Sequence, residues 1–343
     1  MKVLLTGIDG YIGSVAAPLL ASGGHEVVGL DTGLYRNGWL YNDGRRFQPA
    51  CLVEDIRKVE VENLQGVDAV VHLAELSNDP LAELNPDLSF AINHLGSLRL
   101  AQLCREAGIQ RFVYASSCSV YGAGDGEFKS EESETNPLTA YAKCKVRVER
   151  DVAALAADDF SPTFLRNATA YGASPRMRFD IVLNNLSGHA WTSGVIRMTS
   201  DGMPWRPLVH VADICHAIVC TLEAPREAVH AQIFNVGATD QNYRIREVAE
   251  IVSRTFPDCS LTVGSSDGDD RSYRVSFEKI REHLPEFSCH WTAATGAQQL
   301  LSLFERIGLD RETFESRPFT RIKQLKHLLS TGQVDEDLYW RPE

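Results

Sequence analysis

Short apolar runs of strand length alternate with longer amphipathic stretches in the first half of the chain. Runs rich in β-branched residues predict strands at Lys2–Thr6, Glu26–Leu30, Cys51–Val53, Ala69–Leu73 and Arg111–Ala115. Apolar residues at helical spacing predict helices at Tyr11–Ser22 and Leu88–Ala107, each followed by a glycine. Strands that alternate with helices form βαβ units with right-handed crossovers. The pattern therefore predicts an α/β fold, a doubly wound parallel sheet with helices on both faces.

The alternation weakens after about residue 166, where prolines separate shorter elements. We expect residues 1–166 to form the doubly wound domain, with part of 207–232 returning to it, and residues 167–343 to form a smaller domain with a helical tail. The tail helix has an apolar side made by Ile322, Leu325, Leu328 and Leu329. Its other side carries Arg321, Lys323 and Lys326, which predict a solvated face or, alternatively, a surface for a partner.

The chain carries a formal net charge of −12 over 343 residues, of which 44% are hydrophobic. An acidic surface repels nucleic acids and anionic membranes, so we expect neither as a partner. Local backbone N–H groups and a few placed arginines must then bind any phosphate on a ligand. No apolar stretch is long enough to span a membrane, and Gly7 and Asp9 interrupt the apolar start too early for a signal peptide.

Eight cysteines are scattered along the chain, without a C-x-x-C pair. This spacing is typical neither of a disulfide framework nor of a zinc site, and we expect no metal. Most of these cysteines lie in apolar periodic stretches, where a reduced thiol packs as a small hydrophobe. We therefore expect a cytoplasmic protein.

A glycine-rich turn lies between the first predicted strand and the first predicted helix. Gly7, Gly10 and Gly13 form a G-x-x-G-x-x-G pattern that also includes Tyr11 and Ile12. Such glycines permit a tight turn, close approach of the backbone to a pyrophosphate, and close helix–strand packing, while the helix N-terminus supplies N–H donors. The motif predicts a dinucleotide site in a Rossmann-like domain.

Three features after this turn agree with a dinucleotide site. Asp31 ends the second strand, where its carboxylate can accept hydrogen bonds from an adenosine ribose and repel a 2′-phosphate. NAD is therefore favoured over NADP, although Arg36 lies close enough to keep NADP open. Asp55 and Ile56 follow the third strand and can bracket an adenine, and Leu73 and Ala74 end the fourth strand at the ligand edge. The alternative is a glycine turn with unrelated surface acids.

A tyrosine and a lysine four residues apart open a predicted helix. Tyr141 and Lys145 project from the same helical face, where the ammonium favours the phenolate form of a general base. Ser117 follows the strand at Arg111–Ala115 and reaches the same sheet edge, where it can bond the oxygen whose proton Tyr141 takes. The alternative is an exposed helical pair.

At this point the sequence resembles the extended short-chain dehydrogenase/reductase family, the NAD-dependent sugar-nucleotide epimerases and dehydratases. The resemblance rests on TGIDGYIG, Asp31, HLA, Asn93, SSCSVYG with YAKCK, and RPLVHVAD at Arg206–Asp213. It implies that Ser117, Tyr141 and Lys145 are catalytic, and that NAD binds the residues of the glycine turn and five residues after it. These are Gly7, Gly10, Tyr11, Ile12, Gly13, Asp31, Asp55, Ile56, Leu73 and Ala74, with Tyr141 and Lys145.

The resemblance also implies a substrate site for a nucleotide-diphosphate sugar. Arg206 would bind the diphosphate, and Arg178 and Arg271 are further candidates for phosphate or sugar; the alternative for both is a surface salt bridge. The remaining substrate-binding candidates are Ser117, Cys118, Ser119 and Thr169. The family further implies a homodimer, in which Leu88–Ala107 and Leu138–Ala157 pair with their symmetry mates through apolar residues such as Val146, Val148, Val152 and Leu155.

Four positions depart from the family pattern. Cys118 and Ser119 stand where hexose-nucleotide dehydratases carry a pair ending in glutamate, which disfavours 4,6-dehydration. Cys118 is a candidate acid/base group or a buried inert thiol. Glu75, in place of a small residue, is a candidate acid/base group, a sugar ligand or a solvent-exposed side chain. Thr169 replaces the usual asparagine, which changes the expected contacts with the sugar ring.

The sequence therefore predicts an NAD-dependent nucleotide-sugar epimerase that acts through a transient 4-keto sugar, and we expect the reaction at C4. A nucleotide-sugar 4-dehydrogenase or a 4,6- or 5,6-dehydratase on the same scaffold is the alternative. A non-catalytic nucleotide-binding regulatory protein is the alternative from a different class.

Overall fold

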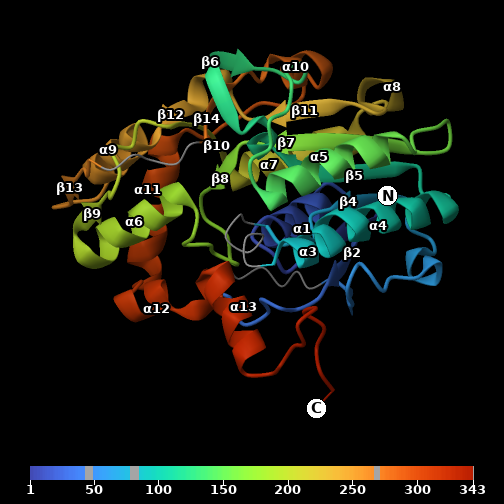
Figure 1. Cartoon of the computed structure of the whole chain (residues 1–343), viewed down its shortest axis with the longest axis horizontal. Helices are drawn as coiled ribbons and strands as arrows, with labels where there is room; N and C mark the ends of the chain where they lie inside the picture. The colour runs from blue at the N-terminus through green and yellow to red at the C-terminus, as the bar shows by residue number, and fades with distance from the viewer. Residues whose placement is uncertain (43–48, 78–84, 266–270, 343) are drawn as a thin grey trace.

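Seven parallel strands make up the central sheet of the computed structural model, which describes residues 1–42, 49–77, 85–265 and 271–342 (Figure 1). Their order across the sheet is β11-β7-β5-β4-β1-β2-β3. The strands are β1 (Lys2–Thr6), β2 (Glu26–Asp31), β3 (Cys51–Val53), β4 (Ala69–His72), β5 (Arg111–Ser117), β7 (Ser161–Asn167) and β11 (Ile233–Val236). The order reverses direction between β1 and β4, which is where doubly wound sheets bind ligands.

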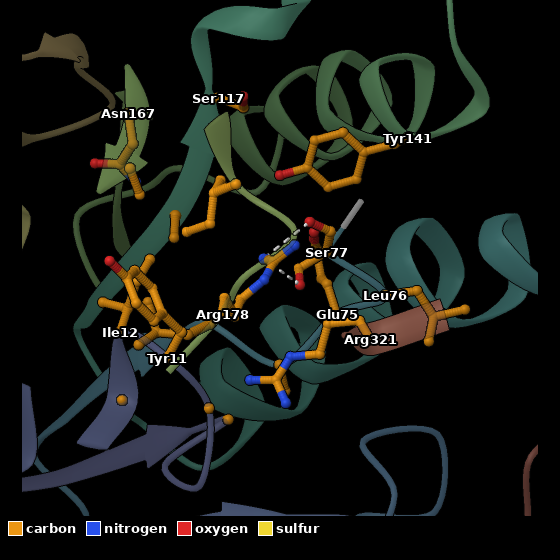
Figure 2. Close-up of a pocket in the computed structure, with 18 of the residues that line it drawn as sticks. Tyr11, Ile12, Glu75, Leu76, Ser77, Ser117, Tyr141, Asn167, Arg178 and Arg321 are labelled. Carbon is orange, nitrogen blue, oxygen red and sulfur yellow. Dashed lines mark hydrogen bonds between the residues drawn. The ribbon is translucent and has the colours of Figure 1, made fainter. Parts of the chain in front are cut away.

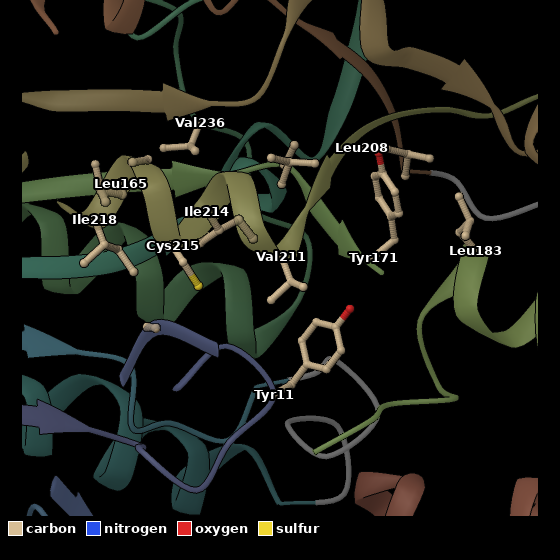
Figure 3. Close-up of a cluster of buried hydrophobic side chains, with 14 of the residues drawn as sticks. Tyr11, Leu165, Tyr171, Leu183, Leu208, Val211, Ile214, Cys215, Ile218 and Val236 are labelled. Atoms are coloured by element: carbon tan, nitrogen blue, oxygen red, sulfur yellow. The ribbon is translucent and has the colours of Figure 1, made fainter. Parts of the chain in front are cut away.

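Both faces of this sheet are covered, as the apolar runs predict. Along β1, Val3 and Leu5 pack into one core cluster and Leu4 packs into the other. The first cluster includes apolar residues of α1 (Gly13–Ser22) and α7 (Val211–Glu223), and Figure 3 shows Ile214 of α7 among the side chains of this cluster. The second includes α4 (Ser97–Glu106) and α5 (Ala140–Ala153). The chain thus returns to the main sheet after β10 (Trp205–His210), through α7 and β11.

The smaller part of the molecule contains helices α6 (Val182–Ser193), α9 (Ile245–Thr255) and α11 (Ala293–Ile307), which pack on one another (Figure 1). The described residues also form three short sheets: β12-β10-β8, β13-β9 and β14-β6. The remaining strands are β6 (Ala123–Lys129), β8 (Thr169–Tyr171), β9 (Val195–Arg197), β12 (Asn242–Arg244), β13 (Ser260–Thr262) and β14 (Ser272–Val275). The remaining helices are η1 (Val61–Leu64), α3 (Pro86–Ser89), η2 (Phe90–Gly96), η3 (Cys118–Tyr121), α8 (Arg226–Val229), η4 (Thr239–Gln241), α10 (Glu278–His283), α12 (Arg311–Glu315), η5 (Arg317–Phe319) and α13 (Arg321–Ser330).

The helical run predicted at Leu88–Ala107 is interrupted by one π-helical segment. α3 leads into the π-helix η2, and α4 follows it. Asn93 lies in η2, where its amide donates to the carbonyl of Leu76 at 3.0 Å and its Oδ1 accepts from the Leu76 N–H at 2.9 Å. The segment therefore holds the loop that leaves β4, next to the cavity described below.

Two expectations about exposed faces are wrong. Val148 and Val152 of α5 are fully buried against the sheet, so they cannot supply surface to a second subunit. In the tail helix α13, Lys323 and Lys326 are exposed as expected, but Arg321 is only 3% exposed, because this turn of the helix lies against the loop after β2. Within the described ranges, no helix is long and apolar enough to cross a membrane.

Candidate active site

A cavity of about 530 Å³ opens at the carboxyl ends of β1, β2, β4, β5 and β7. The glycine turn lines it on one side and the first turn of α5 on another. All twelve residues expected to bind the cofactor line this cavity: Gly7, Gly10, Tyr11, Ile12, Gly13, Asp31, Asp55, Ile56, Leu73, Ala74, Tyr141 and Lys145. Elements far apart in the sequence thus bring these residues to one edge of the sheet.

The backbone around the glycine positions of the turn leaves no room for a Cβ atom. Gly7 has a φ of +72°, and a Cβ there would lie 3.0 Å from the backbone nitrogen of Ala74. A Cβ at Gly13 would lie 2.2 Å from the carbonyl oxygen of Gly7. The turn therefore leaves backbone N–H groups and the N-terminus of α1 open to the cavity, an arrangement that fits the pyrophosphate of a dinucleotide.

The carboxylates beyond the turn are held in fixed orientations. Asp31 accepts from the N–H of Asp9 at 3.0 Å and from that of Gly33 at 2.9 Å, and burial raises the pKa of its carboxyl. Asp55 is held by the guanidinium of Arg57, whose Nη2 lies 2.8 Å from Oδ2. Asp31 also lines the cavity, so its oriented carboxylate fits a ribose hydroxyl. The donor and acceptor groups present therefore suit an adenosine diphosphate moiety.

Tyr11 contributes to the cavity differently from its neighbours in the turn. Its side chain is 5% exposed, donates to the carbonyl of Gly172 at 2.7 Å and accepts from the Asn184 amide at 3.2 Å. Figure 3 shows its ring between the glycine turn and the buried residues of the smaller part. The phenol therefore links the turn to the residue after β8 and to α6.

Lys145 is the centre of a buried polar cluster beside Tyr141. Its Nζ lies 2.5 Å from Glu75 Oε2 and donates to the carbonyl of Ala115. Glu75 Oε1 accepts from the hydroxyl of Tyr114 at 2.5 Å. Burial lowers the pKa of Lys145, but the Glu75 carboxylate raises it further, so that the net shift is upward and the ammonium persists. Glu75 is thus a buried partner of the lysine and not a solvent-exposed side chain.

Tyr141 lies beside this cluster, with Lys145 Nζ 5.3 Å from the centre of its ring. Both residues come from the first turns of α5, which Thr139 caps by accepting from the Ala142 N–H at 3.2 Å. Figure 2 shows the phenol reaching into the cavity toward Arg178, with Ser117 on the adjoining strand end. The predicted serine, tyrosine and lysine therefore line one space.

The three residues after Ser116 have different surroundings. Ser117 lines the cavity, and its Oγ accepts from the Ser119 N–H at 3.1 Å. Ser119 also lines the cavity, and no hydrogen-bond partner for its buried Oγ lies among the described residues. Cys118 is absent from the lining: it is 1% exposed, and its Sγ donates to the carbonyl of Arg166 at 3.1 Å. Burial raises the pKa of this thiol well above its usual value.

The opposite wall carries the residues expected to bind substrate, namely Thr169, Arg178, Arg206 and Arg271. Arg178 is not on the surface: its Nε lies 2.9 Å from Asp180 Oδ1, and its Nη1 donates to Ser77 Oγ at 3.2 Å. Arg206 Nη1 donates to the carbonyl of Trp205 at 2.8 Å and to that of Arg271. Several arginines thus face one cavity of an acidic protein.

Some lining residues were missed by sequence reasoning: Ser77, Asn167, Asp180, Tyr273 and Arg321. Asn167 is the last residue of β7, so the rule that strand ends meet at one edge could have found it, whereas Ser77 lies in the loop after β4. Asp180 stands two residues from Arg178, a spacing compatible with their ion pair. Arg321 has no comparable signal, because it lies far along the chain from every motif.

Comparisons with known proteins agree with this geometry. A model of the NAD dependent epimerase/dehydratase family matches residues 3–237. The UDP-glucose 4-epimerase of Corynebacterium glutamicum is 30% identical over 305 residues, which cover 83% of this chain and 90% of that protein.

Among solved structures, MoeE5 in complex with UDP-glucuronic acid and NAD aligns with a TM-score of 0.76 at 26% identity, over 90% of this chain and 100% of MoeE5. TunA, an NAD-dependent NDP-hexosamine 5,6-dehydratase involved in tunicamycin biosynthesis, aligns with a TM-score of 0.78 at 24% identity, over 89% of this chain and 98% of TunA. The likeness to TunA shows a common fold.

Proposed function

This chain belongs to the NAD dependent epimerase/dehydratase family, and we propose that it is an NAD-dependent epimerase of a nucleotide-diphosphate sugar that acts at C4 through a transient 4-keto sugar. The names of its relatives support this substrate class, since one is a UDP-glucose 4-epimerase and another was solved with UDP-glucuronic acid and NAD. Residues 1–166 with the returning segment would bind the cofactor, and residues 167–343 would mainly bind the sugar nucleotide.

The proposed chemistry uses three side chains of the cavity. NAD, when bound, accepts a hydride from the sugar carbon and returns it to the opposite face. Tyr141 takes the proton of the C4 hydroxyl and later gives it back, and the ammonium of Lys145 favours the phenolate that this requires. Ser117 donates a hydrogen bond to the same sugar oxygen. Arg206 and Arg271 would bind the diphosphate, while Ser119, Thr169 and Arg178 would contact the sugar.

One observation favours epimerisation over dehydration. The carboxylates that line the catalytic end of the described cavity, Glu75 and Asp180, are both ion-paired, with Lys145 and Arg178. A dehydratase needs a group that removes a proton from C5 and another that delivers one to C6. Ser119 stands where such a carboxylate is expected, and its hydroxyl is a poor acid and a poor base. Cys118 lies behind the cavity wall, so its thiol does not contact the substrate in the proposed reaction.

The test follows the hydrogens of the sugar. The nucleotide sugar that copurifies with the protein is identified by mass spectrometry, and turnover is then run in deuterated water. An epimerase returns the same hydride to C4, so the sugar carbons stay unlabelled and the product keeps the mass of the substrate. Deuterium at C5 or C6, or loss of one water, would contradict the proposal. Loss of two hydrogens with stoichiometric reduced cofactor would identify a 4-dehydrogenase.

We also propose that the enzyme is a homodimer and cytoplasmic. The surface of η2 and α5 supports the dimer, because Leu95 is 57% exposed and Leu138, just before α5, is 42% exposed. Free thiols at all eight cysteines support a reducing compartment. Sedimentation at micromolar concentration should give a dimer, and Leu95→Glu should shift it to monomer; a monomeric wild type would contradict the assembly.

A further inference from the structure

The C-terminal segment, residues 321–342, lies against the cofactor-binding half of the molecule. Trp340 Nε1 donates to the carbonyl of Thr32 at 2.7 Å, and Gln324 Nε2 donates to that of Leu34 at 3.1 Å. Arg57, which holds Asp55, donates to the carbonyl of Asp337 at 2.8 Å. The segment lies outside the residues that match the family model, yet it covers the loops after β2 and β3.

Arg321 is the residue of this segment that reaches deepest into the cavity. Its side chain is only 3% exposed and lines the cavity together with Ile322 and Leu338. The guanidinium lies over the ring of Tyr35, with Cζ 4.0 Å from the ring centre. Within the described part of the chain, no hydrogen bond or ion pair engages the guanidinium; only the main-chain nitrogen is engaged, donating to Asp180 Oδ2 at 3.4 Å.

A buried cation of this kind requires an anion. Burial lowers the pKa of Arg321 to about 10, so the guanidinium is still charged at neutral pH. A buried charge without a counter-ion is costly unless a ligand supplies it. The charges of Asp180 and Asp31 attract the guanidinium and that of Arg178 repels it, but within the described residues no carboxylate forms an ion pair with it. The cavity therefore contains a cationic position that suits an anionic group of its ligand.

The place of Arg321 indicates which group this is. The charges of both Asp31, at the adenosine end, and Arg178, near Tyr141, act on Arg321, so it lies between the two ends of the cavity. Figure 2 shows Arg321 entering from the α13 side, with Tyr11 and Ile12 of the glycine turn bordering the same space. A dinucleotide that spans these ends places its pyrophosphate at the middle.

We propose that Arg321 binds the pyrophosphate of NAD from the side opposite the glycine turn, and that the C-terminal segment thereby closes the cavity over the cofactor. This inference rests on the proposed use of NAD. A planar guanidinium with several N–H donors suits bidentate contact with phosphate oxygens, and the glycine turn supplies backbone donors to the other side. The sugar nucleotide also carries a diphosphate, so the experiment separates the two ligands.

The test compares the affinities of NADH, ADP-ribose and UDP for the full-length protein and its variants, by fluorescence and calorimetric titration. Arg321→Gln should weaken NADH and ADP-ribose by about 10- to 100-fold, the loss expected for a charged hydrogen-bonding group, and leave UDP unchanged. Arg321→Lys should bind NADH and ADP-ribose with affinities between those of the wild type and Arg321→Gln. Lys326→Gln, which removes one charge from the exposed side of the same helix, is the matched control and should bind all three ligands normally.

Thermal unfolding distinguishes a ligand contact from a structural role. Without ligand, Arg321→Gln should keep or raise the Tm, because it removes an uncompensated buried charge, but it should lose part of the rise in Tm that NAD produces. A lower Tm with unchanged NADH affinity would overturn the inference, as would weaker binding of UDP alone. If the wild type bound no NADH, the proposed function itself would fail. Equal NADH affinities of the wild type and Arg321→Gln would instead overturn only the role of Arg321.

Discussion

His72 should make the folded protein sensitive to mild acid. It ends β4 in the HLA motif, and its ring is buried between two hydroxyls: Nδ1 is 2.7 Å from Thr6 Oγ1 and Nε2 is 2.8 Å from Ser97 Oγ. Thr6 Oγ1 already accepts from the N–H groups of Leu73 and Ala74, so its own hydrogen is directed at Nδ1. The network therefore assigns the neutral tautomer with hydrogen on Nε2. A second proton on Nδ1 would face the Thr6 hydroxyl donor.

The size of the effect follows from the pKa of this ring. Burial, together with the nearby Lys145 ammonium, lowers the pKa of His72 from 6.5 to about 3. The unfolded chain then binds a proton that the folded chain refuses between these two values, so stability is complete above pH 6.5 and falls as the pH drops toward 3. One pKa unit corresponds to about 1.4 kcal/mol, which gives a total of about 5 kcal/mol and about 3 kcal/mol by pH 4.5.

Urea unfolding between pH 7.5 and pH 4.5 measures this directly. His72 should contribute a fall of about 3 kcal/mol to the free energy of unfolding of the wild type over that range. The free energy of unfolding of His72→Gln should fall less over this range, whatever its value at pH 7.5. Some pH dependence should remain because burial lowers the pKa of His210 to about 4. His283→Gln, at an exposed position, controls for the loss of a histidine. Parallel curves for wild type and His72→Gln would refute the reasoning.

Three further predictions concern the cofactor and the base. Tyr141→Phe should lower turnover by about 10²–10⁴-fold with NADH affinity unchanged, so near-normal activity would show that another group is the base. The wild type should bind NADH more tightly than NADPH, and Asp31→Asn should narrow that preference in parallel titrations; equal affinities in the wild type would remove Asp31 from the ribose site. Gly13→Ala places a Cβ 2.2 Å from the Gly7 carbonyl oxygen, so it should displace the turn and weaken NADH binding at least about tenfold, and unchanged affinity would contradict the close packing.

Local patterns were sufficient for the main sheet and the cofactor end of the site. The strands predicted at Lys2–Thr6 and Arg111–Ala115 correspond to β1 and β5, because alternating burial on two helix-covered faces requires continuous apolar runs. The π-helical segment within Leu88–Ala107 was not predicted, since periodicity does not record one wider turn.

The sequence by itself determined the features that depend on neighbours along the chain. The glycine spacing predicts a tight turn in which the glycine positions cannot carry a side chain. The four-residue separation of Tyr141 and Lys145 puts both residues on one face of α5. Only the tertiary structure decided how distant residues are paired: Glu75 with Lys145, Cys118 behind the wall, and Arg321 inside the cavity. The periodicity of a helix shows which side is apolar, but it does not show which polar residue is covered by another element. Arg321 is buried because α13 lies across the loop after β2. This contact joins residues 290 apart in the chain, so local periodicity carries no sign of it.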